Sequence, residues 1–426
     1  MRDQDLDERI SNWAGNVTFT AGRLHRPSTV AELRSLVAGA RRIHALGTGH
    51  SFSRVADSPG DLVTVAGLPP VMDIDTTTST VTVSAGLRYG ELAQYLHDQG
   101  YALHNLGSLP HLSVAGACAT GTHGSGVRNG GLATAVTSLE LVTAGGELVT
   151  LARGEERFDA AVVGLGAFGV ATRLTLELQP TFEVEQYVYD ALPFDTLRDH
   201  FTEVMAVAYS VSAFTDWTGP TVRSVWVKRR TDEPLPPPTE WLGAVRADGP
   251  RHPIPGMPVE NCTEQLGVPG PWHARLPHFR LEFTPSSGEE LQSEYFVARE
   301  DAAAALEALD TVRDRIAPVL QICEIRTIAA DRQWLSPAYG RDSVAVHFTW
   351  VKDAAAVTPV LGAIEERLAP FGARPHWGKV FEVAPEVVAE RYPRLRDAAA
   401  LARRHDPDGV FRNAMLDRYL AENAGG

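Results

Sequence analysis

Two glycine-rich segments stand out in the N-terminal half of the chain, LGTGHSF at residues 46–52 and SLPHLSVAGACATGTHGSG at residues 108–126. Small residues let backbone N–H groups approach a bound anion, and serine and threonine hydroxyls add further donors. A diphosphate is therefore the ligand we expect for both. Neither segment contains the Gly-Lys-Ser/Thr of a Walker loop or the GxGxxG of a Rossmann turn. Taken alone, each segment is more often a tight connection than a binding site. Each segment also contains a histidine: His50 follows Gly49, and His123 follows Gly121 and Thr122.

Polar residues two apart recur in the C-terminal half. CEIRT contains Glu324 and Arg326, and VHFTW contains His347 and Thr349. In a strand, residues two apart leave the same face, so each pair would present two polar groups to one surface. Taken alone, the sequence favours an exposed cross-strand salt bridge or a polar sheet face as the explanation of either pair. Lys379, in RPHWGK, lies where a chain returning toward the glycine-rich loops would pass a cleft between domains.

Metal binding is not expected at either histidine, because no second histidine or carboxylate lies at a ligand-like spacing from His50 or His123. The three cysteines, Cys118, Cys262 and Cys323, include no CxxC pair, so neither a disulfide framework nor a thiolate metal site is expected. We interpret all three as small buried hydrophobic residues.

Length and charge limit the function classes. The 426 residues suggest two or three domains, with an active-site cleft between them. A net charge of −14 and the absence of Lys/Arg runs make nucleic acid and membrane surfaces poor partners, so we expect a small neutral ligand. The N-terminus mixes charges where a signal peptide needs apolar residues, which predicts a cytoplasmic protein. No exposed apolar helix requires a partner, so we expect a monomer.

The elements that must position these groups follow from periodicity. Residues 26–40 have a helical apolar stripe and a capping box at Thr29 and Glu32, and Gly145 and Gly146 supply the turn of a hairpin. Further helices are expected at residues 89–100, 301–320 and 358–371, and strands at residues 43–46, 61–68, 79–87, 169–180, 221–230, 322–329 and 342–350.

Composition changes near residue 181, and helix-then-strand patterns after it predict a second α/β domain with an antiparallel sheet. Residues 231–258 are rich in proline, and we interpret them as an irregular surface excursion of unassigned role.

Three motifs carry a resemblance to a known family: ALGTGHSF at residues 45–52, HNLGSLPHLSVAGACATGTHGSG at residues 104–126 and HDPDGVFRN at residues 405–413. With them the sequence resembles the vanillyl-alcohol-oxidase superfamily of flavoproteins, and within it the bacterial alditol oxidases, also called xylitol oxidases. The resemblance implies an α+β fold. Residues 1–181 would form a two-subdomain FAD-binding region, residues 182–379 a substrate-binding cap built on an antiparallel sheet flanked by helices, and residues 380–426 a segment returning to the FAD region.

The resemblance also assigns residues to FAD. His50 matches the histidine that family members join covalently to the flavin 8α-methyl carbon. Val170 matches a backbone contact to the adenine part, and His376 matches a residue close to the flavin. The other matched cofactor positions are Leu46, Gly47, Thr48, Gly49, Ser51, Ser108, Ser113, Gly116, Thr120, Gly121, Thr122 and His123.

In the alditol oxidases, the residues that match Ser108, Glu324, Arg326, His347, Thr349 and Lys379 line the polyol pocket. A row of neutral hydroxyls needs carboxylate acceptors, guanidinium donors and hydroxyls that serve as either. The resulting hypothesis is that Lys379 and Arg326 hold the terminal C1 hydroxyl of a polyol such as xylitol or sorbitol. Lys379 accepts its proton while a hydride passes to flavin N5, and O2 is reduced to hydrogen peroxide.

Two alternatives remain open. A sugar-1,4-lactone oxidase or dehydrogenase of the same superfamily would share the flavin loops, a Glu-x-Arg strand and an HWxK-like segment, although the Ser108 context and HFTW favour an alditol. A non-catalytic flavin-binding module would have the loops without a flavin that substrate can reduce.

Overall fold

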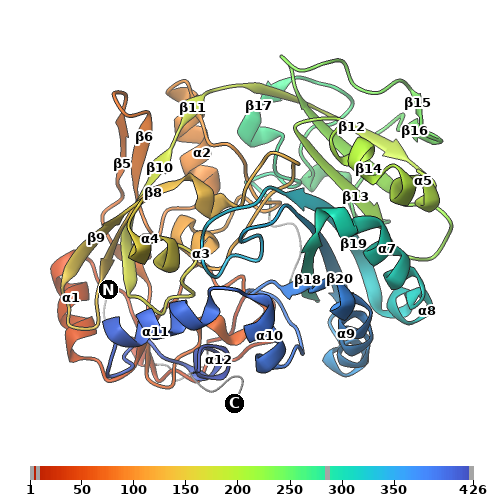
Figure 1. Cartoon of the computed structure of the whole chain (residues 1–426). Coiled ribbons are helices and arrows are strands. Elements are labelled where there is room, and N and C mark those ends of the chain that lie inside the picture. Colours follow the sequence, from red (N-terminus) through yellow and green to blue (C-terminus); the bar gives the residue numbers. More distant parts are fainter. Residues whose placement is uncertain (1–3, 6–9, 284–287, 422–426) are drawn as a thin grey trace.

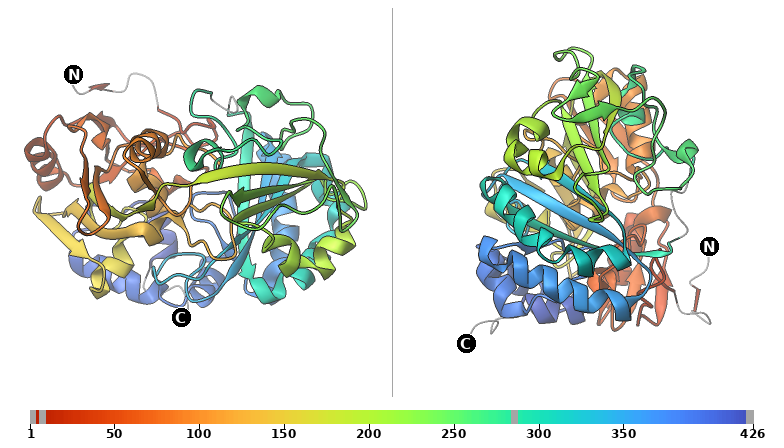
Figure 2. Two further views of the ribbon diagram at one scale, coloured as in Figure 1. Left: turned by 90° about the horizontal axis from the view of Figure 1, so that it is seen from above. Right: turned by 90° about the vertical axis from the view of Figure 1, so that its right-hand side faces the viewer.

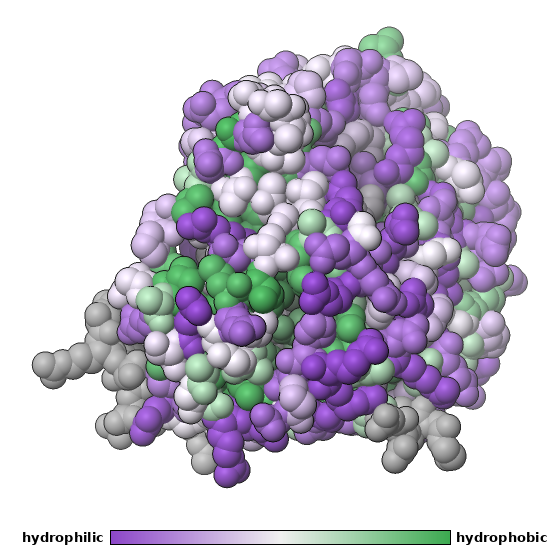
Figure 3. All heavy atoms as spheres, turned by 60° about the vertical axis from the view of Figure 1, so that its left-hand side comes forward, coloured by the Kyte–Doolittle hydropathy of each residue, from purple (hydrophilic) through white to green (hydrophobic). Residues whose placement is uncertain are grey.

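The computed structural model describes residues 4–5, 10–283 and 288–421. Two lobes lie side by side (Figures 1 and 2), which we name the N-terminal lobe (β1 through β11) and the large-sheet lobe (β12 through β21). The last three helices return beneath the N-terminal lobe. In the described part of the chain, no helix is long and apolar enough to cross a membrane. The face shown in Figure 3 is mostly hydrophilic, with hydrophobic residues gathered near its middle.

The first sheet of the N-terminal lobe has the strand order β1-β2-β4-β3. Strands β2, β4 and β3 are parallel, and β1 adds antiparallel to β2. Helix α1 begins where predicted, because the Thr29 side chain accepts a hydrogen bond from the backbone N–H of Glu32 at 3.1 Å. The elements are β1 (Gln4–Asp5), β2 (Arg23–His25), α1 (Val30–Gly39), β3 (Ile43–Ala45) and β4 (Asp61–Val63). The strand predicted at residues 61–68 is shorter than expected, because residues 65–67 form a 3₁₀ turn.

The second sheet is antiparallel, with the order β5-β6-β10-β8-β9, and α2 and α3 precede the hairpin of β8 and β9. Gly146 has φ +76° in the hairpin turn, the conformation for which glycine was predicted there. The elements are β5 (Met72–Asp75), β6 (Thr80–Ser84), α2 (Tyr89–Asp98), β7 (Tyr101–Ala102), α3 (Val114–Ala119), β8 (Val136–Val142), β9 (Leu148–Ala152), α4 (Glu156–Ala161), β10 (Val170–Glu177) and β11 (Gln179–Pro180), with β7 pairing β11.

The large sheet is antiparallel throughout, as predicted, in the order β15-β16-β12-β14-β13-β19-β20-β18-β21, with β17 beside β12. Its strands are β12 (Glu183–Asp190), β13 (Ser210–Thr215), β14 (Ser224–Arg230), β15 (Glu240–Trp241), β16 (Ala244–Arg246), β17 (Gly270–Pro271), β18 (Glu290–Ala298), β19 (Leu320–Ile328), β20 (Ser343–Val351) and β21 (Arg374–Pro375). The side chains of β13, β19 and β20 are buried along almost the whole of each strand, and helices cover one face of the sheet (Figure 2).

Helices cover one side of the large sheet: α5 (Phe194–Asp199), α6 (Phe201–Met205), α7 (Ala302–Asp310), α8 (Arg313–Ile316) and α9 (Ala354–Leu368) (Figure 1). The helix predicted at residues 301–320 is divided into α7, α8 and a 3₁₀ turn at residues 317–319, where Pro318 lacks the N–H that a continuing helix needs. Helix α9 begins earlier than predicted, because Asp353 caps it by accepting from the Ala356 N–H.

The proline-rich segment at residues 231–258 corrects one expectation. It contributes β15 and β16 to the edge of the large sheet, where Tyr189 pairs with Arg246. Its residues His252, Pro253, Ile254 and Met257 line the central cavity, so the segment is not only a surface excursion. Prolines concealed this role, because they predict irregular backbone but not the direction in which it folds.

The C-terminal segment returns to the N-terminal lobe through α10 (Pro385–Arg391), α11 (Leu395–His405) and α12 (Ala414–Tyr419). The Ile43 N–H donates to the Val410 carbonyl at 2.8 Å, and the Asn413 amide donates to the Val55 and Asp57 carbonyls at 2.9 Å each. Residues 405–413 (HDPDGVFRN) therefore hydrogen-bond to β3 of the first sheet and to the loop that follows it. The three cysteines are buried, as predicted.

Candidate active site

One cavity of about 670 Å³ runs between the two lobes. Both glycine-rich segments line it from the N-terminal lobe, and β18, β19, β20 and the segment after β21 line it from the large-sheet lobe. Of the residues predicted for the site, the cavity is lined by Leu46, Gly47, Thr48, Gly49, His50, Ser51, Ser108, Ser113, Gly116, Thr120, Thr122, His123, Glu324, Arg326, His347, Thr349, His376 and Lys379.

Two predicted residues do not line the cavity. Gly121 has φ +76° and turns toward Pro337, which a Cβ on Gly121 would meet at 3.1 Å. Val170 points its side chain into the core of the N-terminal lobe, and its neighbours Gly169 and Ala171 line the cavity in its place. Strand alternation accounts for this exchange, because neighbouring residues of β10 face opposite sides of the sheet.

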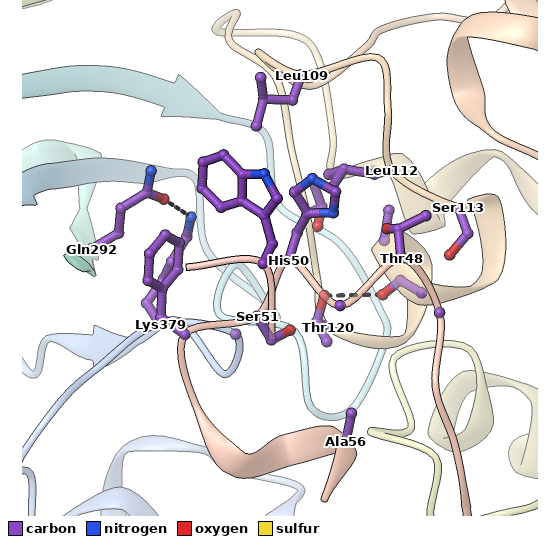
Figure 4. A pocket seen from close by; sticks show the side chains of 18 of the residues that line it. Thr48, His50, Ser51, Ala56, Leu109, Leu112, Ser113, Thr120, Gln292 and Lys379 are labelled. Carbon is purple, nitrogen blue, oxygen red and sulfur yellow. Dashed lines mark hydrogen bonds between the residues drawn. The ribbon is translucent and has the colours of Figure 1, made fainter. Parts of the chain in front are cut away.

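The loop at residues 46–53 is fixed by contacts from both lobes. The Phe52 N–H donates to the Gly378 carbonyl at 2.7 Å, and the Ser53 hydroxyl donates to the Trp377 carbonyl at 2.6 Å. His50 projects from this loop into the cavity (Figure 4) and stacks on Trp13, with ring centroids 5.2 Å apart. Its Nδ1 is buried and has no hydrogen-bond partner in the described structure. Burial, with the nearby His111 and Lys379, lowers the pKa of His50 to about 4, so its imidazole is neutral and nucleophilic.

The two glycine-rich segments meet at Ser113, just before α3. A Cβ on Gly47 would approach the Ser113 Oγ to 2.7 Å, and a Cβ on Gly116 would approach it to 2.8 Å. Glycine at both positions leaves the Ser113 hydroxyl in place, so that backbone and hydroxyl donors can face the cavity together. Neutral donors and one orphaned imidazole nitrogen fit the phosphates and the isoalloxazine of FAD, so the residues present suit this group.

A row of ionisable side chains crosses the large sheet at the other end of the cavity. His347 on β20 lies opposite Glu294 on β18 and opposite Glu324 on β19. Thr349, two residues along β20, lies opposite Gln292 and accepts from or donates to His347 at 3.3 Å. The two-residue spacing thus brings the predicted pairs to one face, and that face lines the cavity.

Arg326 is held by two carboxylates. Its Nη2 donates to Glu294 Oε1 at 2.8 Å, its Nε lies 3.5 Å from Glu324 Oε2, and its Nη1 donates to the Ser108 hydroxyl at 3.3 Å. Burial opposes ionisation of Glu294, yet His123 and Arg326 hold its pKa well below the ordinary value. Burial likewise opposes ionisation of Glu324, whose pKa Arg326 and His278 lower. Both carboxylates are therefore charged, and so is Arg326.

Lys379 reaches the cavity beside this row. Its Nζ donates to Gln292 Oε1 (Figure 4) and lies 5.2 Å from the centre of the Phe52 ring. Burial lowers the pKa of Lys379 to about 8, with Glu294 opposing and Arg326 adding to the effect. A minor part of the amine, far more than for an ordinary lysine, is therefore neutral near physiological pH, and this form can accept a proton. His376, whose pKa burial lowers to about 3, accepts at Nδ1 from the Gly378 N–H at 3.0 Å.

Sequence reasoning missed several cavity residues. Glu290, Gln292 and Glu294 on β18 have the same two-residue spacing that identified Glu324 and Arg326, so this signal was present. No local pattern singles out Trp13 or His278, because tertiary contacts alone bring them to the site. The further lining residues that carry polar or aromatic groups are Trp13, Phe19, Arg26, His44, Phe52, Ser53, Thr64, Arg88, Phe214, His252, His278, Phe279, Glu289, Glu290, Gln292, Glu294 and Gln321.

Comparison with protein families gives two matches. A family model described as FAD binding domain matches residues 22–152, and one described as D-arabinono-1,4-lactone oxidase matches residues 288–419. Cholesterol oxidase from B. sterolicum has a similar fold, with a TM-score of 0.79 over 97% of this chain and 96% of that chain, at 16% sequence identity.

Curated relatives extend over the full length. An alditol oxidase from Streptomyces sp. is 56% identical over 418 residues, which cover 97% of this chain and 100% of the relative. An L-gulono-1,4-lactone dehydrogenase from Mycobacterium tuberculosis is 32% identical over 96% of this chain and 98% of the relative. The bovine L-gulonolactone oxidase is 26% identical over 97% of this chain and 98% of the relative.

Proposed function

The chain belongs to the alditol oxidase family of FAD-dependent oxidoreductases, and from this premise we propose that it oxidises the terminal C1 hydroxyl of a polyol such as xylitol or sorbitol. The products are the aldehyde and, from O2, hydrogen peroxide. The observation that carries the proposal is the buried row of Glu294, His347 and Glu324 with Arg326, which offers carboxylate acceptors and guanidinium donors to a row of hydroxyls. Membership of this family makes the chain an enzyme, not a non-catalytic flavin-binding module.

The N-terminal lobe, with the residues after 379, would hold FAD, and residues 182–379 would hold the substrate. Gly47, Gly116 and Ser113 would face the diphosphate, because the two glycines let the loops approach the Ser113 hydroxyl closely. When bound, FAD supplies a hydride acceptor for the C1 hydrogen and an electron donor for O2.

A covalent bond from His50 to the flavin is part of the proposal. The partnerless Nδ1 and the neutral ring support it, because a covalent link needs a nitrogen with a free lone pair. Trp13 stacks on the imidazole and restricts its rotation, which would keep the nitrogen directed toward one position.

The substrate hydroxyls would be positioned by charged partners. Arg326, already fixed by Glu294 and Glu324, would donate to the C1 oxygen, and Ser108 would accept from or donate to the adjacent hydroxyl. Glu324, Thr349 and His347 would bind the hydroxyls farther along the chain. A pocket of buried charged groups discriminates strongly against analogues that lack a hydroxyl, since the protein groups would be left unpaired.

Lys379 would accept the C1 hydroxyl proton. Gln292 takes one N–H of the amine, which leaves the nitrogen lone pair free to turn toward substrate. Arg326 cannot take this role, because its paired carboxylates raise its pKa. Arg326, which stays charged, would therefore stabilise the developing alkoxide, and the neutral amine of Lys379 would remove the proton.

The second candidate is a sugar-1,4-lactone substrate, favoured by the D-arabinono-1,4-lactone oxidase match at residues 288–419. Peroxide release from xylitol, sorbitol and gulono-1,4-lactone at equal concentrations separates the two. Turnover of the polyols over the lactone supports the alditol proposal, and the reverse order overturns it. We further propose that the protein acts in the cytoplasm as a monomer, and its net charge of −14 disfavours nucleic acid and membrane surfaces as partners.

A further inference from the structure

A buried lysine lies directly behind the substrate-binding carboxylate. Only three of the 39 lysine and arginine residues of the chain are lysine, and one of them, Lys228 on β14, is 1% exposed. Lys228 does not line the cavity. Its neighbour His278 does, and connects it to Glu324.

Lys228 Nζ has three partners, which matches the three N–H bonds of an ammonium. It donates to the Leu276 carbonyl at 2.6 Å and to the Pro277 carbonyl at 3.0 Å, and it lies 3.1 Å from His278 Nδ1. Burial lowers the pKa of Lys228 to about 7, with the Glu324 carboxylate opposing the shift. In its ammonium form Lys228 has no lone pair, so His278 Nδ1 accepts from it. The proton of the neutral imidazole is therefore on Nε2, which lies 2.7 Å from Glu324 Oε1 and donates to it.

The charged groups around His278 keep it neutral. Lys228 faces it from β14, and Glu324 and Arg326 face it from β19. The rings of Phe214, Trp226 and Phe279 enclose it. Burial and the two cations lower the pKa of His278 to about 4 despite the adjacent Glu324.

We propose that Lys228 is a positioning residue for the reaction: it fixes the Nε2–H tautomer of His278, so that His278 always donates to Glu324 and holds this carboxylate toward the substrate hydroxyls. The proposal rests on the assignment of Glu324 to substrate binding made above. With Oε1 bound by His278 and Oε2 beside Arg326, the carboxylate keeps one orientation, and its remaining lone pairs face the cavity.

Lysine suits this position better than arginine. The ammonium directs three donors tetrahedrally from one atom, whereas a guanidinium spreads its donors in a plane and cannot serve two carbonyls and an imidazole from one point. In a chain that otherwise uses arginine almost exclusively, the retained lysine fits this geometric demand.

The test is a double-variant cycle in the FAD-loaded enzyme, with xylitol affinity measured from anaerobic flavin reduction between pH 6 and pH 9. Lys228→Met removes the donor to Nδ1, so His278 can move its proton to Nδ1. Xylitol Kd is expected to rise about tenfold at pH 6, where Lys228 of the wild type is largely protonated. The difference from the wild type should shrink as the pH rises through about 7, the value to which burial lowers the pKa of Lys228. The limiting rate of flavin reduction should change less than about threefold, because the reacting groups are untouched.

The variant Lys228→Met/His278→Gln provides rescue, because a glutamine amide presents a donor to Glu324 in the absence of Lys228. We expect its Kd to return to within about threefold of His278→Gln alone and to be independent of pH. A merely structural role for Lys228 is not rescued by a change at residue 278. Lys352→Met is the matched control, since this exposed lysine pairs with Glu289 at the end of the sheet.

The proposal is overturned if Lys228→Met leaves the xylitol Kd unchanged. It is also overturned if the raised Kd neither varies with pH nor is restored in the double variant. If Lys228→Met does not fold, ¹⁵N-histidine NMR of the wild type determines the tautomer of His278. The Nε2–H tautomer is expected, and the Nδ1–H tautomer would overturn the proposal. A wild type whose flavin xylitol does not reduce overturns the proposed function instead, which distinguishes the two failures.

Discussion

Glu294 lies opposite His347 in the β18–β20 register, and the two side chains share the same buried neighbour, Arg326. Glu294 Oε1 accepts from Arg326 Nη2 at 2.8 Å and lies 3.1 Å from His123 Nε2, while Oε2 lies 3.7 Å from His347 Nδ1. One carboxylate therefore connects the second glycine-rich segment to the substrate face of the large sheet. The two lobes meet through this charge as well as through apolar packing.

Glu294→Gln is expected to destabilise the protein. It keeps the shape of the side chain but leaves Arg326 with Glu324 as its one remaining carboxylate, and removing a partner from a buried ion pair costs about 3 kcal/mol. Chemical denaturation of the FAD-loaded protein measures the loss. Glu289→Gln is the control, since its side chain is 71% exposed in a pair with Lys352 and its loss should cost less than about 1 kcal/mol. Equal effects of the two variants would contradict this assignment.

Lys379→Met is expected to lower the rate of flavin reduction by polyol about 10²- to 10⁴-fold while flavin binding persists, because it removes the proposed base. In the wild type, burial lowers the pKa of Lys379 to about 8, and only the neutral amine accepts a proton. The value of kcat/KM should therefore rise as pH increases through about 8 and then level off. Stopped-flow reduction at several pH values measures both. A flat profile, or a Lys379→Met variant reduced at the wild-type rate, would remove Lys379 from the mechanism.

Gln292→Leu tests the support of this amine. Gln292 Oε1 accepts a hydrogen bond from Lys379 Nζ, so its loss frees the amine to rotate and removes an acceptor that favours the protonated form. The ascending limb of the kcat/KM profile should move to lower pH, and the plateau should fall about tenfold through lost orientation. A pH–rate series against the wild type measures both changes, and an unmoved limb would show that Gln292 does not act on Lys379.

His50→Ala tests the covalent link. The wild-type protein precipitated with acid should keep its yellow colour in the pellet, whereas the variant should release free FAD to the supernatant, because Nδ1 of His50 is the buried nitrogen without a partner at this position. Absorption of pellet and supernatant measures the partition. Trp13→Phe is a useful companion, since it keeps an aromatic ring against His50 and should retain the link. A colourless wild-type pellet would disprove the covalent attachment while leaving FAD binding open.

The sequence predicted many individual site residues but not the strand register that brings them together. Local spacing placed Glu324 with Arg326, and His347 with Thr349, on one face of a strand, and the structure keeps that period. The resemblance to the alditol oxidases, and not the spacing, assigned them to the substrate pocket. The same spacing exists at Gln292 and Glu294 but was not read, and it acquires meaning only from the register of β18 with β20. Register between strands about 50 residues apart depends on the whole sheet, so no local pattern specifies it.

For the fold, too, the sequence predicted the elements that local signals specify but not the course of segments that tertiary contacts direct. Helix α1 and the hairpin of β8 and β9 follow from caps and turn glycines, which act locally. The inward course of residues 252–257 does not, because these residues are directed by their contacts with the large sheet and not by their own propensities.

Gly47→Ala tests the close approach of the two glycine-rich segments. The added Cβ would meet the Ser113 Oγ at 2.7 Å, so either the hydroxyl or the loop must move, and purified Gly47→Ala should carry much less FAD than the wild type. Removing the hydroxyl relieves the contact, because in Gly47→Ala/Ser113→Ala the Cβ of residue 47 meets Ser113 Cβ only at 3.9 Å. FAD content, read from the ratio of flavin to protein absorbance, should therefore recover in the double variant to the level of Ser113→Ala alone. A double variant as poor in FAD as Gly47→Ala would show that residue 47 acts on the cofactor itself and not through Ser113.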